Sequence, residues 1–419
     1  MSKLIIKGGN PLKGVVKIGG MKNAATPIIA ATLLTGEECV IKNAPKILDV
    51  DKMISLIRSL GGQAKWIENN TLKICNKDLN FHTLDKKIIQ SMRSSVLLLS
   101  PLLHRFKNIE IPEPGGCIIG KRPLDTHIYI FKEFGVEIAR QNKVICLNSK
   151  KEIKGVDIIL PEFSVTATEN AIMLGVLAKG KTIVKLAALE PNVQDLCCFL
   201  KKMGAKIKGI GTYTLVIEGV KNLKGASHNL IPDQIEAGTF AVAAVVTKGN
   251  VKIENIIPSH LEIILLKLKQ IGANFKLGSN NLEIYPSNNL KSFNLQTLPY
   301  PGFPTDLQAP FSFLATQCEG DSLIHETLYE NRFNHIQELV KMGAKAKILD
   351  SHQVLISGPA SLRGREIKSF DLRAGATLII AGLIAQGETV INEAEIVDRG
   401  YERIEERLGD LGAEIKRVE

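Results

Sequence analysis

Long apolar stretches are missing from this chain of 419 residues. No segment approaches the roughly 18 consecutive apolar residues that a membrane-spanning helix needs. The first residues, MSKLIIKGGNPLKG, also lack the apolar run of a secretory signal peptide. The sequence therefore predicts a cytoplasmic protein with no membrane partner. One hydrophobic core rarely serves so long a chain, so we expect two or three domains.

Metal-ligand spacings are absent as well. The seven cysteines are scattered and odd in number, no two of them form a C-x-x-C pair, and the eight histidines lack the spacing of a metal site. These patterns argue against a disulfide framework and against zinc. We therefore expect neither a metal nor a cofactor.

Aromatic residues are few, at 5% of the chain, whereas 53 Lys and Arg against 43 Asp and Glu give a formal charge of +10. A basic excess can serve nucleic acid, a membrane surface or a small anionic substrate. The cations are spread out, and few rings are available to stack on bases. A small polyanionic substrate therefore fits at least as well as nucleic acid.

An internal repeat organises the chain. Six short stretches resemble one another, and their first glycines lie 74, 69, 68, 71 and 69 residues apart, at Gly61, Gly135, Gly204, Gly272, Gly343 and Gly412. So regular a period indicates a repeat architecture. Because six such units exceed one core, we expect three repeats in each of two domains, joined near residues 229–232.

Each repeat contains two kinds of predicted helix. An amphipathic helix, such as NVQDLCCFLKKM, precedes each of these glycines, which then suit the left-handed position after a helix C-terminus. An earlier helix, such as TFAVAAVVTKG, is apolar nearly all round and should be buried. One repeat therefore reads as buried helix, strand, surface helix and strand.

Polar and charged residues recur at the starts of these helices. The buried helices begin near Lys22 with Asn23, Arg93, Thr166, Gln234, Asp306, and Asp371 with Arg373; the surface helices begin near Asp49, Arg122, Asn192, His260, Arg332 and Arg399. Helix N-termini attract anions through unpaired N–H groups and the macrodipole. With the six cations among these residues, they predict an anion-binding cleft. Asp306 and Asp371 also fit simple capping roles.

One cysteine has an unusual setting. The stretch PEPGGCIIGKRP places Cys117 between a Gly-Gly pair and a Lys-Arg pair. Glycines permit otherwise strained loop conformations, and neighbouring cations influence the proton affinity of a thiol. The alternative is a small buried side chain, which is the usual role of an unpaired cysteine.

Six motifs together carry a family resemblance: GGMKNAA (residues 19–25), PGGCIIGKRPLDTH (114–127), PDQIEAGTF (232–240), FPTDLQAP (303–310), ENRF (330–333) and DRGYERIEE (398–406). Through them the sequence resembles, from end to end, the UDP-N-acetylglucosamine enolpyruvyl transferases. The cysteine motif is the most specific, because the related 5-enolpyruvylshikimate-3-phosphate synthases share the fold and lack it.

The resemblance implies a fold and a domain division. The expected fold is α/β, with two inside-out α/β barrel domains, each built from three ~70-residue repeats, and a cleft between them. Residues 22–230 would form the domain of repeats one to three, with the Cys117 loop. Residues 1–21 and 231–419 would form the domain of repeats four to six.

The resemblance also implies a reaction. The enolpyruvyl group of phosphoenolpyruvate would move to the 3′-hydroxyl of UDP-N-acetylglucosamine with release of phosphate, by addition and then elimination, as the first committed step of peptidoglycan synthesis. Cys117 matches the cysteine that protonates phosphoenolpyruvate and that fosfomycin alkylates, and Asp306 matches the candidate base for the 3′-hydroxyl. The residues expected to act in catalysis are Cys117, Asp306, Lys22 and Arg399.

Further positions match substrate contacts of the family. Lys22, Arg122 and Arg399 match residues that hold phosphoenolpyruvate, with Asn23 beside Lys22. The expected contacts to the UDP-sugar are Arg93, Arg122, Pro123, Leu124, Asp125, Thr126, Ser164, Val165, Asp306 and Leu328. Arg332, Asp371 and Arg373 join the substrate-binding set through their places at helix starts.

Two departures from the family pattern concern binding. Thr166 stands where the family usually has glycine, and Gln234 stands where an arginine is common. Two other readings stay open. A shikimate-pathway synthase of the same fold would use shikimate 3-phosphate, and a basic nucleic-acid-binding protein would bind with strong salt dependence.

Overall fold

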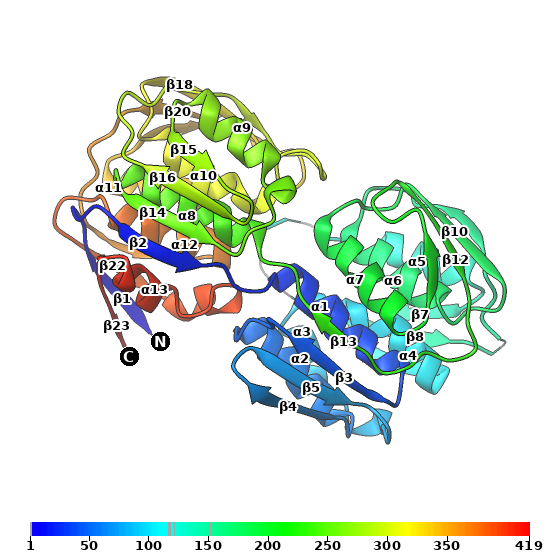
Figure 1. Ribbon diagram of the computed structural model, residues 1–419. Helices are drawn as coiled ribbons and strands as arrows, with labels where there is room; N and C mark the ends of the chain where they lie inside the picture. The colour runs from blue at the N-terminus through cyan, green and yellow to red at the C-terminus, as the bar shows by residue number, and fades with distance from the viewer. Residues whose placement is uncertain (1, 116–118, 121, 151) are drawn as a thin grey trace. The chain divides into compact units, whose positions relative to one another are not determined.

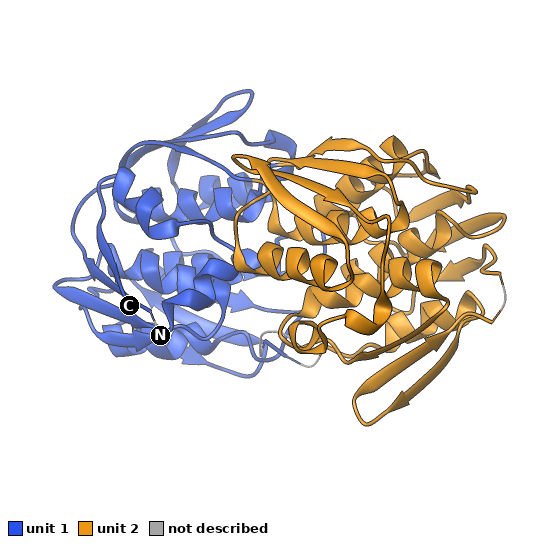
Figure 2. Cartoon of the chain, turned by 90° about the horizontal axis from the view of Figure 1, so that it is seen from below, with its two compact units in different colours: residues 1–19, 118–121, 232–419 blue, residues 20–117, 122–231 orange. Residues whose placement is uncertain are grey.

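The computed structural model describes residues 2–115, 119–120, 122–150 and 152–419. They form a mixed α/β protein of two compact units (Figure 2). The described residues within 1–19, 118–121 and 232–419 make unit 1, and those within 20–117 and 122–231 make unit 2. Each unit has its own hydrophobic core. Among the described residues, no helix has both the length and the apolar character to cross a membrane.

Unit 2 contains three small sheets around three buried helical segments. The sheet orders are β13-β3-β5-β4, β6-β8-β7 and β11-β12-β10-β9. The strands are β3 (Glu38–Lys42), β4 (Gln63–Glu68), β5 (Thr71–Cys75), β6 (Asn108–Pro112), β7 (Glu137–Gln141), β8 (Val144–Asn148), β9 (Asp157–Ile159), β10 (Lys181–Lys185), β11 (Lys206–Lys208), β12 (Thr214–Glu218) and β13 (Ser227–Asn229). The helices are α1 (Lys22–Ala31), η1 (Thr32–Leu34), α2 (Leu48–Ser59), η2 (Phe81–Thr83), α3 (Lys86–Gln90), η3 (Arg93–Leu98), α4 (Leu99–Phe106), α5 (Asp125–Glu133), α6 (Val165–Gly175) and α7 (Pro191–Lys202).

Unit 1 is organised in the same way, with sheet orders β21-β22-β1-β23, β15-β16-β14-β2 and β17-β18-β20-β19. Its strands are β1 (Lys3–Lys7), β2 (Lys13–Lys17), β14 (Asn250–Glu254), β15 (Asn274–Leu277), β16 (Asn281–Tyr285), β17 (Leu295–Gln296), β18 (Gly320–His325), β19 (Lys345–Ile348), β20 (Gln353–Gly358), β21 (Glu366–Lys368), β22 (Glu388–Asn392) and β23 (Glu414–Val418). Its helices are α8 (Gln234–Val246), η4 (Pro258–His260), α9 (Glu262–Gln270), η5 (Thr305–Leu307), α10 (Gln308–Ala315), α11 (Asn334–Met342), α12 (Leu372–Gly382), η6 (Ala394–Arg399) and α13 (Ile404–Asp410).

The helices predicted to be buried lie in the interiors of the units. In unit 1, α8, α10 and α12 pack against one another (Figure 1), and every residue of α8 except the last is buried. The strands instead alternate between buried and exposed residues, as β3 does, because successive side chains of a strand point to opposite faces. The apolar, all-round pattern therefore marks the core helices correctly.

The six repeat glycines all adopt the predicted left-handed conformation. Their φ angles lie between 77° and 112°, and each glycine follows a surface helix and precedes a strand. A side chain is disfavoured at such φ values, so glycine ends the helix at the lowest conformational cost. This prediction is confirmed in every copy.

Two of the buried helices begin differently from the continuous α-helices that the sequence predicts. The residues before α4 and before α10 form the 3₁₀ helices η3 and η5. Pro101 and Pro310 lie in the first turns of α4 and α10, where a missing N–H group costs no helical hydrogen bond. In α4 the α-helical hydrogen bonds therefore start later than the apolar pattern does.

The first strands of the chain belong to unit 1. β1 pairs antiparallel with both β22 and β23, and β2 pairs parallel with β14. Residues from the two ends of the chain thus share one sheet.

Candidate active site

Asp306 lies between two arginine side chains of unit 1. Its Oδ1 accepts a hydrogen bond from Arg332 Nη2 at 2.7 Å, and its Oδ2 accepts one from Arg373 Nη2 at 3.0 Å. The arginine side chains are only 5% and 3% exposed, whereas that of Asp306 is 25% exposed. The carboxylate is therefore held by two buried cations and is still accessible from solvent.

Both arginines keep their charge in spite of this burial. Burial alone lowers the pKa of the Arg373 guanidinium, but Tyr401 and Asp306 raise that pKa above its usual value. The pKa of Arg332 is also raised, because the attraction of Asp306 and Asp371 outweighs the effect of burial. Opposite charges nearby favour the charged form. A fixed pair of guanidinium forks of this kind suits carboxylate and phosphate groups.

Aromatic rings restrict the two guanidinium groups. The Arg373 Cζ lies 5.2 Å from the ring centroid of Tyr401, and the Arg332 Cζ lies 5.4 Å from that of Tyr329. The Tyr401 hydroxyl is in turn 2.9 Å from Thr239 Oγ1 on α8. Cations are attracted to the faces of such rings, so these contacts help to fix both arginines.

Asp371 caps α12. Its Oδ1 accepts hydrogen bonds from the backbone N–H groups of Arg373 at 2.8 Å and Ala374 at 3.0 Å. This is the geometry of a helix N-cap, which satisfies N–H groups that have no partner within the helix. The capping role that the sequence allowed for Asp371 is therefore observed.

Arg399 ends η6 and is followed by a loop that is anchored at both sides. The guanidinium of Arg417, on β23, donates to both oxygens of Asp398 at 2.7 and 3.0 Å. It also donates to Glu405 Oε2 at 3.0 Å. Partial burial raises the pKa of Glu405, but the hydrogen bond from Arg417, a backbone hydrogen bond and the charges of Arg417 and Arg403 together leave that pKa below its usual value. Arg417 thus fixes the residues that flank Arg399.

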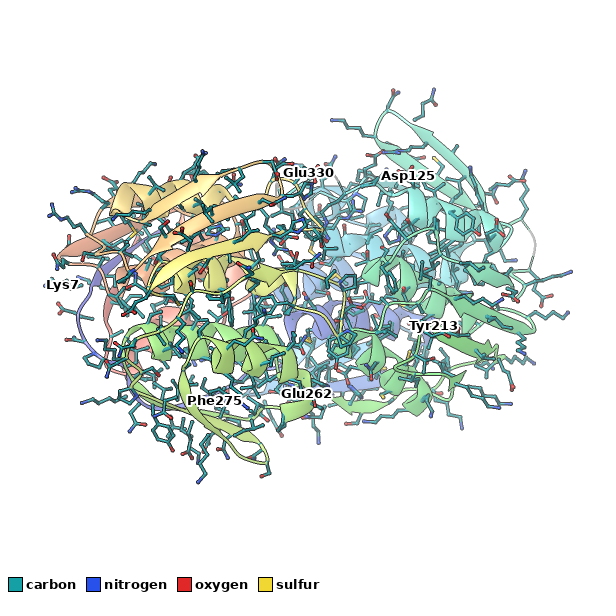
Figure 3. All side chains as sticks on the ribbon, turned by 90° about the horizontal axis from the view of Figure 1, so that it is seen from above. Lys7, Asp125, Tyr213, Glu262, Phe275 and Glu330 are labelled. Carbon is teal, nitrogen blue, oxygen red and sulfur yellow. The ribbon has the colours of Figure 1, made fainter. Side chains whose placement is uncertain are left out.

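Cys117 lies outside the described residues, but two later residues of its motif, Ile119 and Gly120, are described. The carbonyl oxygen of Ile119 accepts a hydrogen bond from the Asn331 N–H at 3.2 Å. A Cβ atom added to Gly120 would lie only 2.4 Å from Glu330 Oε2, and Glu330 is labelled in Figure 3. Only glycine fits so close to that carboxylate, so this end of the loop packs directly against the ENRF motif.

In unit 2, Lys22 forms a largely buried ion pair at the start of α1. Its Nζ is 3.1 Å from Asp49 Oδ2, and the two side chains are 16% and 3% exposed. Asn23 is the next residue of α1, and the N-cap residue, Met21, makes no side-chain capping bond. The N-terminus of α1 therefore presents backbone N–H groups beside a lysine, which favours an anion.

Arg93 and Arg122 both lie near the buried side chain of His127. Arg93 Nη2 donates a hydrogen bond to the carbonyl oxygen of Pro123 at 3.0 Å. Burial, together with the charges of Arg93 and Arg122, lowers the pKa of His127 to about 3. A neutral imidazole thus lies near two cations that the sequence predicts to bind substrate.

The other predicted contacts of unit 2 lie at the starts of two helices. Pro123 and buried Leu124 precede α5, and exposed Asp125 begins it (labelled in Figure 3). The Thr126 hydroxyl donates to Glu162 Oε1 at 2.6 Å.

The second of these helices is α6. Ser164 is its N-cap residue and Val165 its first residue. Thr166, where the family usually has glycine, has its Oγ1 3.1 Å from His127 Nε2. Its hydroxyl therefore occupies space that a glycine would leave open.

Leu328 and Gln234, in unit 1, complete the positions singled out from the sequence. Leu328 is 38% exposed, and its N–H donates to Glu326 Oε1 at 2.9 Å. Gln234 is 7% exposed and is the first residue of α8.

The structure brings Asp306, Arg332 and Arg373 into direct contact within unit 1. In unit 2, Arg93 and Arg122 lie close enough to His127 for their charges to lower its pKa. Sequence reasoning missed the residues that support these clusters, namely Thr305, Glu326, Tyr401, Arg417 and His127. Only Thr305, Tyr401 and His127 stand inside the quoted motifs, so position in a motif was a signal for these three.

Comparisons with known proteins give a consistent relationship. A family model described as EPSP synthase (3-phosphoshikimate 1-carboxyvinyltransferase) matches residues 6–408. A UDP-N-acetylglucosamine 1-carboxyvinyltransferase from Coxiella burnetii is 45% identical, over 100% of this chain and 96% of the relative. One from Helicobacter pylori is 44% identical, over 100% and 99% of the two chains.

Solved structures agree on the fold. The enolpyruvyl transferase NikO from Streptomyces tendae superposes with a TM-score of 0.90 at 24% identity, covering 100% of this chain and 99% of that one. An EPSP synthase from Acinetobacter baumannii has a TM-score of 0.74 at 19% identity, with both chains fully covered. Together with the end-to-end identity to curated relatives, these matches place the chain in the enolpyruvyl transferase family, among the UDP-N-acetylglucosamine 1-carboxyvinyltransferases.

Proposed function

We propose that this protein transfers the enolpyruvyl group of phosphoenolpyruvate to the 3′-hydroxyl of UDP-N-acetylglucosamine, releases phosphate, and so performs the first committed step of peptidoglycan synthesis in the cytoplasm. The observation that carries the proposal is the 44–45% identity, over the whole chain, to relatives named for this activity. The cysteine motif at residues 114–127 agrees with it.

In this proposal Asp306 accepts the proton of the 3′-hydroxyl. An ionised carboxylate can take up a proton, and the hydrogen bonds from Arg332 and Arg373 fix the orientation of this one. The partial exposure of Asp306 lets a hydroxyl approach. As the 3′-oxygen bonds to C2 of phosphoenolpyruvate, Cys117 delivers a proton to C3. Loss of a proton from C3 and departure of phosphate from C2 then restore the double bond.

The cations bind the anionic groups of the two substrates. Lys22, Arg122 and Arg399 hold phosphoenolpyruvate, with Asn23 beside Lys22. The UDP-sugar is held by Arg93, by residues 122–126, by Ser164, Val165 and Leu328, and by Asp306, while Arg332, Asp371 and Arg373 shape the site around Asp306. The buried ion pair of Lys22 with Asp49 supports this assignment, because it fixes the lysine at a helix N-terminus. Fosfomycin is the expected covalent inhibitor, at the sulfur of Cys117.

The fold proposal follows the same family. Each unit is one inside-out α/β barrel domain of three repeats, and the cleft formed by the two domains holds the substrates. The three sheets and the three buried helical segments of each unit support it. The domain boundaries proposed from the sequence, at residues 21–22 and 230–231, lie within two residues of two divisions between the compact units. The described residues 119–120 differ, because they group with unit 1 and not with the domain of residues 22–230.

The test is phosphate release from phosphoenolpyruvate by the purified chain. We expect release with UDP-N-acetylglucosamine, little release without an acceptor, and none above that background with shikimate 3-phosphate. Turnover of shikimate 3-phosphate in place of the nucleotide sugar would refute the proposal and favour the shikimate-pathway alternative.

A further inference from the structure

A fully buried carboxylate lies close behind the Asp306 cluster. Glu326 follows β18 directly and is 0% exposed. Its Oε1 accepts hydrogen bonds from Thr297 Oγ1 at 3.0 Å and from the Leu328 N–H at 2.9 Å. Its Oε2 accepts one from Thr305 Oγ1 at 2.6 Å. A buried carboxylate is costly unless its oxygens are hydrogen-bonded, and here both oxygens are.

The Thr305 hydroxyl connects this carboxylate to Arg332. A threonine hydroxyl has one proton to donate and lone pairs to accept with. Since the proton of Thr305 goes to Glu326, its oxygen faces Arg332 as an acceptor, and Arg332 Nη1 donates to it at 2.6 Å. The other terminal nitrogen of Arg332 donates to Asp306 Oδ1 at 2.7 Å. Glu326, Thr305, Arg332 and Asp306 therefore form one continuous chain of hydrogen bonds.

We propose that Glu326 is a positioning residue for the reaction, which acts through the Thr305 hydroxyl and the Arg332 guanidinium to fix the Asp306 carboxylate. The inference rests on the proposed function, because it assigns Glu326 to the transfer reaction in which Asp306 is the base.

The charges and the geometry both support this role. Arg332 is 5% exposed, and the rotamer freedom of an arginine must be restrained if its fork is to hold one orientation. Thr305 supplies the second fixed point of that fork. The negative charge of Glu326 is also among the groups that raise the pKa of Arg332. Without Glu326, the hydroxyl proton of Thr305 would be free to turn toward Arg332. The Thr305 oxygen would then no longer face Arg332 as an acceptor.

Glu326 also has a purely structural contact that serves as an internal control. Thr305 donates to Oε2 of Glu326, whereas the Thr297 hydroxyl donates to Oε1. When Thr297 is changed, Oε1 keeps its hydrogen bond from the Leu328 N–H. Thr297→Val and Thr305→Val each remove one threonine hydroxyl from Glu326, but only Thr305→Val interrupts the route to Arg332. The pair separates a positioning role from a structural one.

The experiment measures kcat and KM for both substrates in Thr305→Val, Thr305→Ser and Thr297→Val, together with thermal stability. We expect Thr305→Val to lower kcat by about 10–100-fold, the order expected when a reacting group is displaced by about 1 Å. Thr305→Ser should recover most of the loss because it restores the hydroxyl. Thr297→Val should keep kcat within about threefold of wild type while it lowers the melting temperature.

The pH profile adds a readout that a structural role would not change. Thr305→Val weakens the hold of Arg332 on Asp306, so a carboxylate that loses one stabilising cation should become active only at higher pH. The acid limb of kcat should therefore move to higher pH in Thr305→Val and in Glu326→Gln, but not in Thr297→Val.

The outcomes are distinct. The role of Glu326 would be overturned if Thr305→Val kept the kcat of the wild type, or if Thr297→Val and Thr305→Val lost kcat equally. In either case, turnover of both substrates by the wild-type protein would leave the proposed function standing. Failure of the wild-type protein to turn over the two substrates would instead refute the proposed function itself.

Discussion

The buried histidine of unit 2 should make the stability of the protein depend on pH in a defined window. His127 is 3% exposed, and its pKa is lowered to about 3, chiefly by burial and then by the charges of Arg93 and Arg122. The Asn170 amide nitrogen lies 3.2 Å from His127 Nδ1 and also donates to the Val96 carbonyl oxygen at 3.1 Å. Because that nitrogen is a donor, Nδ1 accepts and Nε2 carries the proton of a neutral ring.

The sign and size of the effect follow from proton linkage. An unfolded histidine titrates near 6.5, so between about pH 6.5 and about pH 3 the unfolded chain binds a proton that the folded chain does not. Stability contributed by His127 is therefore constant above about pH 6.5 and falls as the pH decreases below it. At about pH 5 the loss amounts to about 2 kcal/mol from this one side chain.

The assay is urea unfolding of wild type, His127→Gln and His82→Gln at about pH 8 and about pH 5. His127→Gln should be less stable at the higher pH, because polar contacts are altered, but its deficit should shrink by about 2 kcal/mol at the lower pH. His82 is exposed in η2, so His82→Gln should follow wild type at both values. An identical pH dependence in His127→Gln and wild type would refute the assignment of a neutral, buried imidazole.

Three further changes test the site. Asp306→Asn should lower kcat by about 10²–10⁴ while calorimetry still detects binding of the UDP-sugar, and turnover within a few fold of wild type would contradict the role of Asp306 as the base. Cys117→Asp should keep measurable activity and resist fosfomycin, whereas Cys117→Ser, with a much weaker acid, should be less active; fosfomycin-sensitive, wild-type turnover in Cys117→Ser would remove the thiol from the mechanism. Arg417→Met should raise the KM for phosphoenolpyruvate, because it frees the loop after Arg399. It should also destabilise unit 1 by about 2–3 kcal/mol, as expected for the loss of a partly buried, bidentate ion pair. The control Arg403→Met removes only an exposed ion pair with Glu406, worth about 0.5 kcal/mol, and an equal effect of the two changes on KM would count against the role of Arg417.

Local rules were enough to predict the repeated scaffold. Glycine at a helix end and an apolar pattern around a whole helix depend on a few neighbouring residues and on burial. They recur in all six copies, so each copy supports the interpretation of the others. The 3₁₀ helix η3 was missed because the apolar pattern continues through it, while Pro101 shifts the first α-helical hydrogen bonds. η5 consists of Thr305, Asp306 and Leu307, and its two polar residues carry no helical pattern of their own.

The supporting residues of the site could not be predicted in this way. Glu326 reaches Thr305 across 21 residues of sequence, and Arg417 reaches Asp398 across 19. Contacts of this kind depend on how β18 and β23 lie beside neighbouring elements. The periodic pattern of a sequence does not predict which side chains will meet in this way. In the sequence, Glu326 and Arg417 resemble ordinary surface charges until their burial and their partners are known.

The two aspartates at equivalent repeat positions illustrate how a shared scaffold acquires different chemistry. Capping preference alone suits both, but only Asp371 has its carboxylate on the first N–H groups of its helix. α10 begins after Asp306, at an N-cap residue without a side-chain capping bond, and the Asp306 oxygens turn to Arg332 and Arg373 instead. The capping bond of Asp371 also holds the backbone N–H of Arg373, whose side chain reaches Asp306. The structural aspartate of one repeat thereby fixes a cation that the preceding repeat uses, which is how an ordinary helix cap comes to support the site.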